Sequence, residues 1–148
     1  MDNVESNDDE IKNEGINNVN VYSSFIFILN VLVAFYKSYY LYAFLFLCLT
    51  VSSVIHHTYQ NIYTNMIDKI VIFAVVIYGG NMFYQKQSSE KYIQKILIII
   101  TFLLCIFLYI FGYVVKDFCF HDDLCIGNNW HCLLHMIGSV GHILIMLL

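Results

Sequence analysis

The sequence lacks proline and arginine and contains few charged residues. Its 148 residues include seven lysines as the only strong bases and 12% charged residues in total, against 59% hydrophobic and 17% aromatic residues. This balance is typical of a polytopic membrane protein, because a soluble core of this size could not enclose so much apolar surface. Seven scattered lysines form no basic patch, so the composition also argues against nucleic acid as a partner.

Acidic residues are concentrated at the start of the chain. Six of the eleven lie within the first fourteen residues, in a polar, Asn-rich stretch that predicts a disordered head over residues 1–20. The first apolar run begins only near Val21, behind this acidic stretch, which is unlike a secretory signal peptide. We therefore expect residues 21–148 to form a transmembrane domain.

Five apolar runs follow one another with short polar stretches between them. They lie at residues 21–36, 40–57, 66–84, 96–115 and 130–148. A bilayer core of about 30 Å is crossed by a helix of about 20 such residues. The sequence therefore predicts an all-α, polytopic membrane helix bundle of about five transmembrane helices, a multi-pass protein of an endomembrane or the plasma membrane. Gly79 and Gly80, inside the third run, indicate close helix packing or the end of the helix.

Polar side chains gather at one level of the predicted bundle. With five antiparallel spans, the side that carries the N-terminus also receives the end of the second span and the starts of the third and fifth. Five residues then lie near one leaflet: Ser53, His57, Asp68, His131 and His135. His131 and His135 are four residues apart, so two imidazoles on one helix face can bind one metal ion. Polar groups inside a bilayer are costly, which makes this level a candidate functional site.

The residue types indicate zinc chemistry. Three imidazoles, from His57, His131 and His135, with an open fourth position match a catalytic Zn²⁺ site. Such an ion activates water and polarises a carbonyl group. Asp68 is the candidate proton acceptor, and Ser53, one turn before His57, is the candidate donor to a developing oxyanion. Because the site lies at the membrane boundary, the expected substrate is a membrane lipid with an amide or ester at headgroup depth.

Other interpretations of these residues stay open. Ser52 and His56 have the same spacing as Ser53 and His57, so the alternative ligand is His56. Asp68 could be only the cap of the third span, where the helix dipole favours an acid. A histidine at this depth can also be an interfacial residue. A structural zinc site could instead use Cys119, His121, Cys125 and His131, and Cys119 could form a disulfide with Cys125 in an oxidising compartment.

The ordered set resembles the CREST superfamily of membrane hydrolases. The shared elements are Ser53-x3-His57, Asp68 eleven residues later, and His131-x3-His135 at the start of the last span. The superfamily includes alkaline ceramidases, progestin and adipoQ receptors with bacterial hemolysin III, GPI-anchor lipid-remodelling proteins and myomaker-like proteins. The likeness covers residues 40–148, and the segment from Trp130 through Gly138-Ser139 to His142 is most similar to the ceramidases.

The resemblance implies a zinc-dependent intramembrane hydrolase of a lipid amide or ester. The alternative it implies is a non-enzymatic membrane protein, like hemolysin III or an adipoQ receptor, with a structural zinc site. The family has seven spans where this chain has five runs, so we expect a shortened version of the seven-helix fold. A homo-oligomer, in which a second copy supplies the missing helices, is compatible with this. The acidic calcium-binding segment of alkaline ceramidases has no counterpart in residues 1–20.

Overall fold

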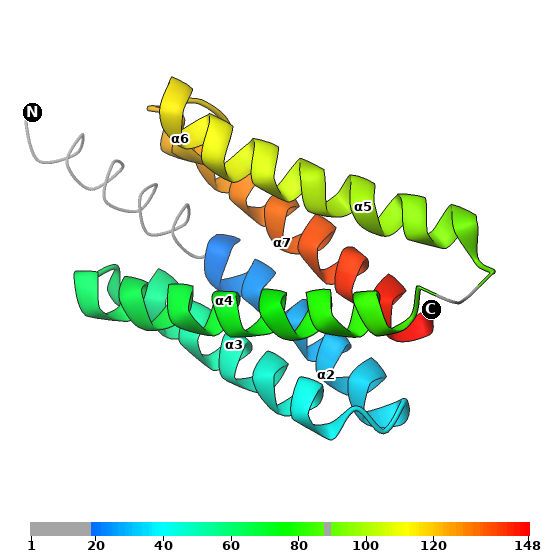
Figure 1. Ribbon diagram of the computed structural model, residues 1–148. Coiled ribbons are helices and arrows are strands. Elements are labelled where there is room, and N and C mark those ends of the chain that lie inside the picture. The colour runs from blue at the N-terminus through cyan, green and yellow to red at the C-terminus, as the bar shows by residue number, and fades with distance from the viewer. Residues whose placement is uncertain (1–18, 88–89) are drawn as a thin grey trace, which may run out of the picture.

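The computed structural model describes residues 19–87 and 90–148 (Figure 1). Within these residues it contains helices and no strands, and five helices are long and apolar enough to cross a membrane: Val19–Tyr36, Tyr40–Tyr59, Ile62–Gln85, Tyr92–Val115 and Leu124–Leu147. The predicted all-α membrane helix bundle is therefore confirmed. The head was predicted over residues 1–20, and its residues 1–18 lie outside the described residues. Residues 19–20 are helical and belong to the first span, so the prediction is wrong for these two residues.

The spans contain several helical elements in chain order. The first span ends in α2 (Phe27–Tyr36), and α3 (Tyr40–Tyr59) and α4 (Ile62–Gln85) form the second and third. The fourth span consists of α5 (Tyr92–Ile106), a π-helical turn η1 (Phe107–Phe111) and α6 (Gly112–Val115). A short 3-10 helix, η2 (Phe118–Phe120), precedes α7 (Leu124–Leu147). Only residues 60 and 61 separate α3 from α4, so these two helices form a tight antiparallel hairpin.

Two helices begin earlier than their apolar runs predict, because Asx side chains cap them. Asn61 precedes α4 and its side chain accepts a hydrogen bond from the Thr64 amide. Asp123 precedes α7 and accepts from the amides of Cys125 and Ile126. Such side chains satisfy amides that lack an intrahelical partner. Asp68 therefore lies in the second turn of α4, and the interpretation of Asp68 as the cap of this helix is wrong.

Helix α7 lies at the centre of the bundle. It packs against α2, α4 and α5, while α3 packs between α2 and α4. Figure 1 shows α5 running alongside α7, on the opposite side from α3. Because successive spans alternate in direction, the end of α3, the start of α4 and the start of α7 share one side of the bundle, as the sequence predicts.

Basic and amide side chains at the opposite side hold the C-terminal turn of α7. Lys86, Lys91 and Gln94 donate hydrogen bonds of 2.7 to 3.3 Å to carbonyl oxygens of residues 144–147. The carbonyls of residues 145–147 lie where a helix leaves its acceptors unpaired, and the helix dipole favours cations there. The contacts fix the far end of α7 against α4 and α5.

Gly79 allows α4 to approach the Tyr42 and His142 side chains. A Cβ atom at residue 79 would lie 2.5 Å from Tyr42 Oη and 2.8 Å from His142 Nδ1, whereas a Cβ at Gly80 would meet nothing within 4 Å. Tyr42 is fully buried and hydrogen-bonded to His142, so it has little room to move. The predicted close packing is therefore found at Gly79 and not at Gly80.

Gly79→Ala should destabilise the bundle, because the new methyl group overpacks this contact. Overpacking of this kind costs about 1–3 kcal/mol. Unfolding of the purified protein in detergent, followed by circular dichroism, measures the change. Gly80→Ala is the matched control and should not lower stability. Equal effects of the two changes would contradict the contact.

Candidate metal centre

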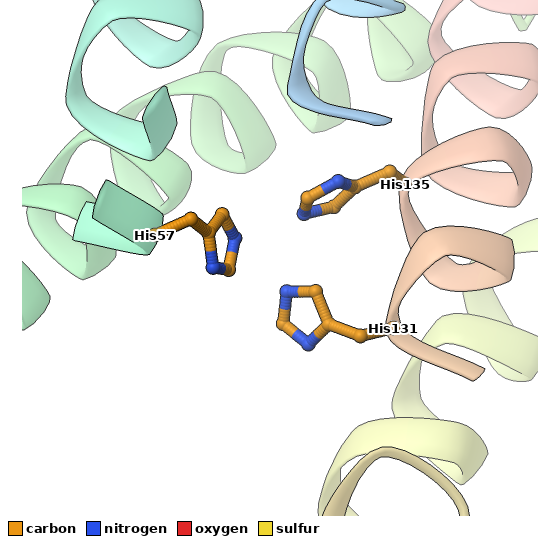
Figure 2. Close-up of side chains that lie close together, drawn as sticks. All are labelled: His57, His131 and His135. Carbon is orange, nitrogen blue, oxygen red and sulfur yellow. The ribbon is translucent and has the colours of Figure 1, made fainter. Parts of the chain in front are cut away.

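Three imidazoles from two helices converge near one end of the bundle. His57 comes from the last turn of α3, and His131 and His135 come from successive turns of α7; Figure 2 shows the three rings pointing toward one another. The ring centroids lie 4.7 to 5.5 Å apart. His57 and His135 are buried, and His131 is half-buried. The structure thus brings together the three residues that the sequence nominates as metal ligands.

The distances between the rings suit one shared ion after a small adjustment. One ligand nitrogen from each ring can be chosen so that all three lie within 4.8 Å of one another. Two nitrogens bound to a tetrahedral Zn²⁺ at about 2.0–2.1 Å lie roughly 3.3 Å apart. The distance between any two ligand nitrogens therefore needs to shorten by at most about 1.5 Å, and small rotations of the three side chains can achieve this.

One nitrogen in this group has no partner. His57 Nε2 is buried and makes no hydrogen bond, and among the described residues the three imidazoles make none with one another. An unpaired buried polar group costs about 1–3 kcal/mol. A neutral, all-imidazole ligand set is one that Zn²⁺ favours. A bound cation would satisfy the unpaired nitrogen, so the residues present fit a metal ion.

His56 faces a different part of the protein. Its Nδ1 lies 3.5 Å from the Thr64 hydroxyl oxygen on α4, and it is not a member of the three-imidazole group. Consecutive residues on a helix are rotated by about 100°, so only one of the adjacent histidines can turn toward α7. The geometry therefore favours His57 over His56 as the ligand.

The two adjacent serines of α3 make different contacts. Ser52 donates a 2.7 Å hydrogen bond to the Asp68 carboxylate, so Ser52 is the serine that holds the candidate proton acceptor. Ser53 is 2.9 Å from the Ser24 hydroxyl of the first span. Ser24 donates its single hydrogen to the Asn20 carbonyl, which makes Ser53 the donor to Ser24. The hydroxyl hydrogen of Ser53 is thus already engaged, and the described contacts of Ser53 and Asp68 do not include the three imidazoles.

Aromatic side chains brace the start of α7 beside His131. The Trp130 ring lies 5.1 Å from Phe118, edge to face, and Phe118 packs on Phe107 of the π-helical turn at 5.3 Å. Phe118 adopts a left-handed backbone conformation with φ of 54°, which a bulky residue takes only where the surrounding packing holds it. This cluster fixes the end of α7 from which His131 and His135 project.

The cysteine-containing alternative site is not assembled. All five cysteines are free, and within the described residues His57, His131 and His135 form the one group of three or more potential ligands that lies close enough together. His121 Nδ1 instead accepts a hydrogen bond from the Asp123 amide as α7 begins. Burial raises the pKa of the Cys119 thiol to about 11, which disfavours the thiolate that binds metals.

Two contacts of the site were missed in the sequence. The spacing pairs Ser52 with His56, whereas Ser52 donates to Asp68. No motif in the sequence predicts the second contact, in which Ser23 Oγ lies 2.9 Å from His135 Nδ1. The available signal was the pair Ser23-Ser24 inside an otherwise apolar run, since hydroxyls in membrane helices bond to neighbouring helices. Which helix they would meet depends on the rotation of the first span, which the sequence does not contain.

The histidine cluster makes a prediction about metal binding. The purified wild-type chain should bind about one zinc ion, because three histidine ligands and one open position make a single tetrahedral site. His57→Ala and the double change of His131 and His135 to Ala should remove it, because each takes away a ligand. His56→Ala is the matched control and should keep the ion. Elemental analysis after dialysis measures this, and zinc retained in the double variant would refute the site.

Cys119 and Cys125 should differ in thiol reactivity. The thiolate is the reactive form, and a pKa raised to about 11 leaves about one Cys119 in a thousand ionised at pH 8. Alkylation of Cys119 should therefore be slow and should accelerate about tenfold per pH unit between pH 8 and 10. Exposed Cys125 should react faster at pH 8. Iodoacetamide labelling of chains that retain one of these cysteines, followed by mass spectrometry, tests both statements, and equal rates would contradict them.

Comparison with known proteins adds no relative: no family model, no curated protein and no solved structure matches the chain. The case for a metal centre rests on the three converging imidazoles and on the unpaired nitrogen of His57.

Proposed function

We propose that this protein is a zinc-dependent hydrolase that cleaves an amide or ester bond of a membrane lipid. The observation that carries the proposal is the three-imidazole group, with two rings buried and one half-buried, near one end of a bundle of membrane-length helices. His57, His131 and His135 would hold the ion and leave its fourth position for water or substrate. The order of these residues in the chain, with Ser53 and Asp68, resembles the CREST superfamily and supports the same proposal.

Bound Zn²⁺ would supply a Lewis acid that polarises the lipid carbonyl and activates water. Asp68 is the candidate general base. Its carboxylate is buried on α4 and accepts a hydrogen bond from Ser52, which fixes one oxygen and leaves acceptor capacity on the carboxylate to take a proton from water. Ser52 therefore orients the base in this proposal, a role that the spacing alone did not assign.

Ser53 is the candidate donor to the oxyanion. Its hydroxyl currently donates to Ser24, so it would need to rotate away from the first span to reach a developing negative charge. Loss of one such donor costs about 10²- to 10³-fold in rate in a well-studied hydrolase. The rotation is a single change of the side-chain torsion χ1, and it would break only the Ser24 contact.

The location of the surface hollows keeps a second candidate function open. A hollow of about 710 Å³ is lined by residues 90–94, Leu97, Leu144 and Leu147, and a smaller one by Ile126, Asn129, Trp130 and Leu133. Neither is lined by the three histidines. An ion in a site without a substrate chamber would tie α3 to α7, as in a non-enzymatic protein of the hemolysin III or adipoQ-receptor kind.

Asp68→Asn separates the two functions, because it removes the base and preserves its shape. Loss of general-base help costs about 10²- to 10⁴-fold in rate, so the variant should retain zinc and lose most hydrolysis. Product detection on a panel of sphingolipids and glycerolipids, together with elemental analysis, measures both quantities.

Asp122→Asn is the control for this experiment, since Asp122 is an exposed residue in the loop before α7. It should leave the rate unchanged. Full activity in Asp68→Asn would eliminate Asp68 as the base. A wild-type chain that holds zinc and hydrolyses none of the lipids would replace the hydrolase with the structural role.

A further inference from the structure

The first span reaches the histidine cluster through one hydroxyl group. Ser23 Oγ lies 2.9 Å from Nδ1 of His135 and 3.0 Å from the carbonyl oxygen of Asn20. Figure 2 shows His135 close to the first span and turned toward the other two rings. A ligand of the candidate metal centre is thus contacted by a residue outside the helices that carry the ligands.

The chemistry of the three groups decides the direction of these hydrogen bonds. A carbonyl oxygen can only accept, so Ser23 satisfies the Asn20 contact by donating its single hydrogen there. With that hydrogen used, the Ser23 oxygen acts as an acceptor toward His135, which places the proton of a neutral His135 on Nδ1. The reverse arrangement would place two oxygen lone pairs against each other at 3.0 Å.

This direction determines which nitrogen of His135 is available to a metal. A neutral imidazole has one N–H and one lone pair. With the proton on Nδ1, the lone pair lies on Nε2. Ring-orienting hydrogen bonds of this kind are a general requirement of histidine ligands, because they fix the tautomer and raise the basicity of the coordinating nitrogen.

We infer that Ser23 is a positioning residue of the metal centre, which holds His135 in the Nδ1–H tautomer and leaves its Nε2 lone pair free for the ion. The inference rests on the metal site of the proposed function. It assigns the first span a role in the site in addition to its packing against α3 and α7. The matched residue is Ser24, which donates to the same Asn20 carbonyl but has Ser53 rather than an imidazole as its second partner.

The first test measures the tautomer directly in the metal-free, full-length protein. Nitrogen NMR of histidine rings labelled with ¹⁵N distinguishes a protonated from an unprotonated ring nitrogen, and His135→Gln identifies the signals of His135. Wild type should show Nδ1 protonated. In Ser23→Ala the Nδ1–H state should lose population, since its acceptor is gone. An Nε2–H tautomer in the wild type would overturn the inference.

The second test measures the affinity for Zn²⁺ by competition with a chelator. Ser23→Ala should bind zinc about 10- to 100-fold more weakly, the usual effect of removing a partner of a histidine ligand. Ser23→Thr keeps the hydroxyl and should restore the affinity, and Ser24→Ala should not weaken it. Wild-type affinity in Ser23→Ala, or equal losses in Ser23→Ala and Ser24→Ala, would overturn the inference.

The two tests separate failure of this inference from failure of the proposed function. A wild-type chain that binds no zinc would refute the metal centre and with it the role of Ser23 in metal binding. Zinc binding that is indifferent to Ser23 would refute the positioning role alone. If Ser23→Ala does not fold, the tautomer of His135 in the wild type and the zinc affinity of Ser23→Thr still test the positioning role of Ser23.

Discussion

The structure depends on the pairing of polar side chains inside a bundle whose outer surface is apolar. A polar group without a partner is expensive in hydrocarbon, and here such groups pair between helices: Ser24 with Ser53, Ser52 with Asp68, Asn30 with Ser139, and Tyr42 with His142. Each pair fixes the rotation of one helix against another. His57 is an exception, because its Nε2 is buried without a hydrogen-bond partner, and Asn20 Oδ1 in the first span is another. Of the two unpaired buried atoms in the described residues, only His57 Nε2 belongs to a residue of the three-imidazole group, and it is therefore the stronger physical argument for an ion.

The sequence predicts a residue's position well where helix periodicity and the side of the membrane alone determine it. His131 and His135 share a helix face by their spacing, and the alternation of five spans puts His57 at the same depth; the structure brings all three together. Periodicity did not decide between His57 and His56, a choice that rested on the family spacing to Asp68, and the separate contacts of Ser52 and Ser53 were not predicted. They depend on the rotation of α3 about its axis, and two adjacent candidates with the same spacing carry no information about that rotation.

Helix boundaries were predicted less well, for a physical reason that affects the site. The apolar runs mark where side chains contact hydrocarbon, whereas a helix begins where its free amides find a cap. Asn61 and Asp123 are such caps, and they extend α4 and α7 beyond their apolar runs. Because α4 begins at Ile62, Asp68 lies in its second turn rather than at the exposed helix end, and its side chain is buried against Ser52. Asp68 is therefore a buried carboxylate and not a helix cap. A buried carboxylate is costly unless it is hydrogen-bonded, as Asp68 is to Ser52.

The proposed metal binding and the proposed hydrolysis depend on different groups in this architecture. The ligands come from α3 and α7, Ser23 lies on the first span, and Asp68 lies on α4, so α5 contributes none of these groups. α5 packs along α7 rather than between α3 and α4. On the proposed kinship with a seven-helix family, a shortened chain that lacks two spans somewhere between Asp68 and His131 would keep its ligand set and lose part of the wall around a substrate. An intact three-histidine centre is therefore a necessary condition for the proposed hydrolysis, and the enclosure of a lipid substrate is the second, independent condition.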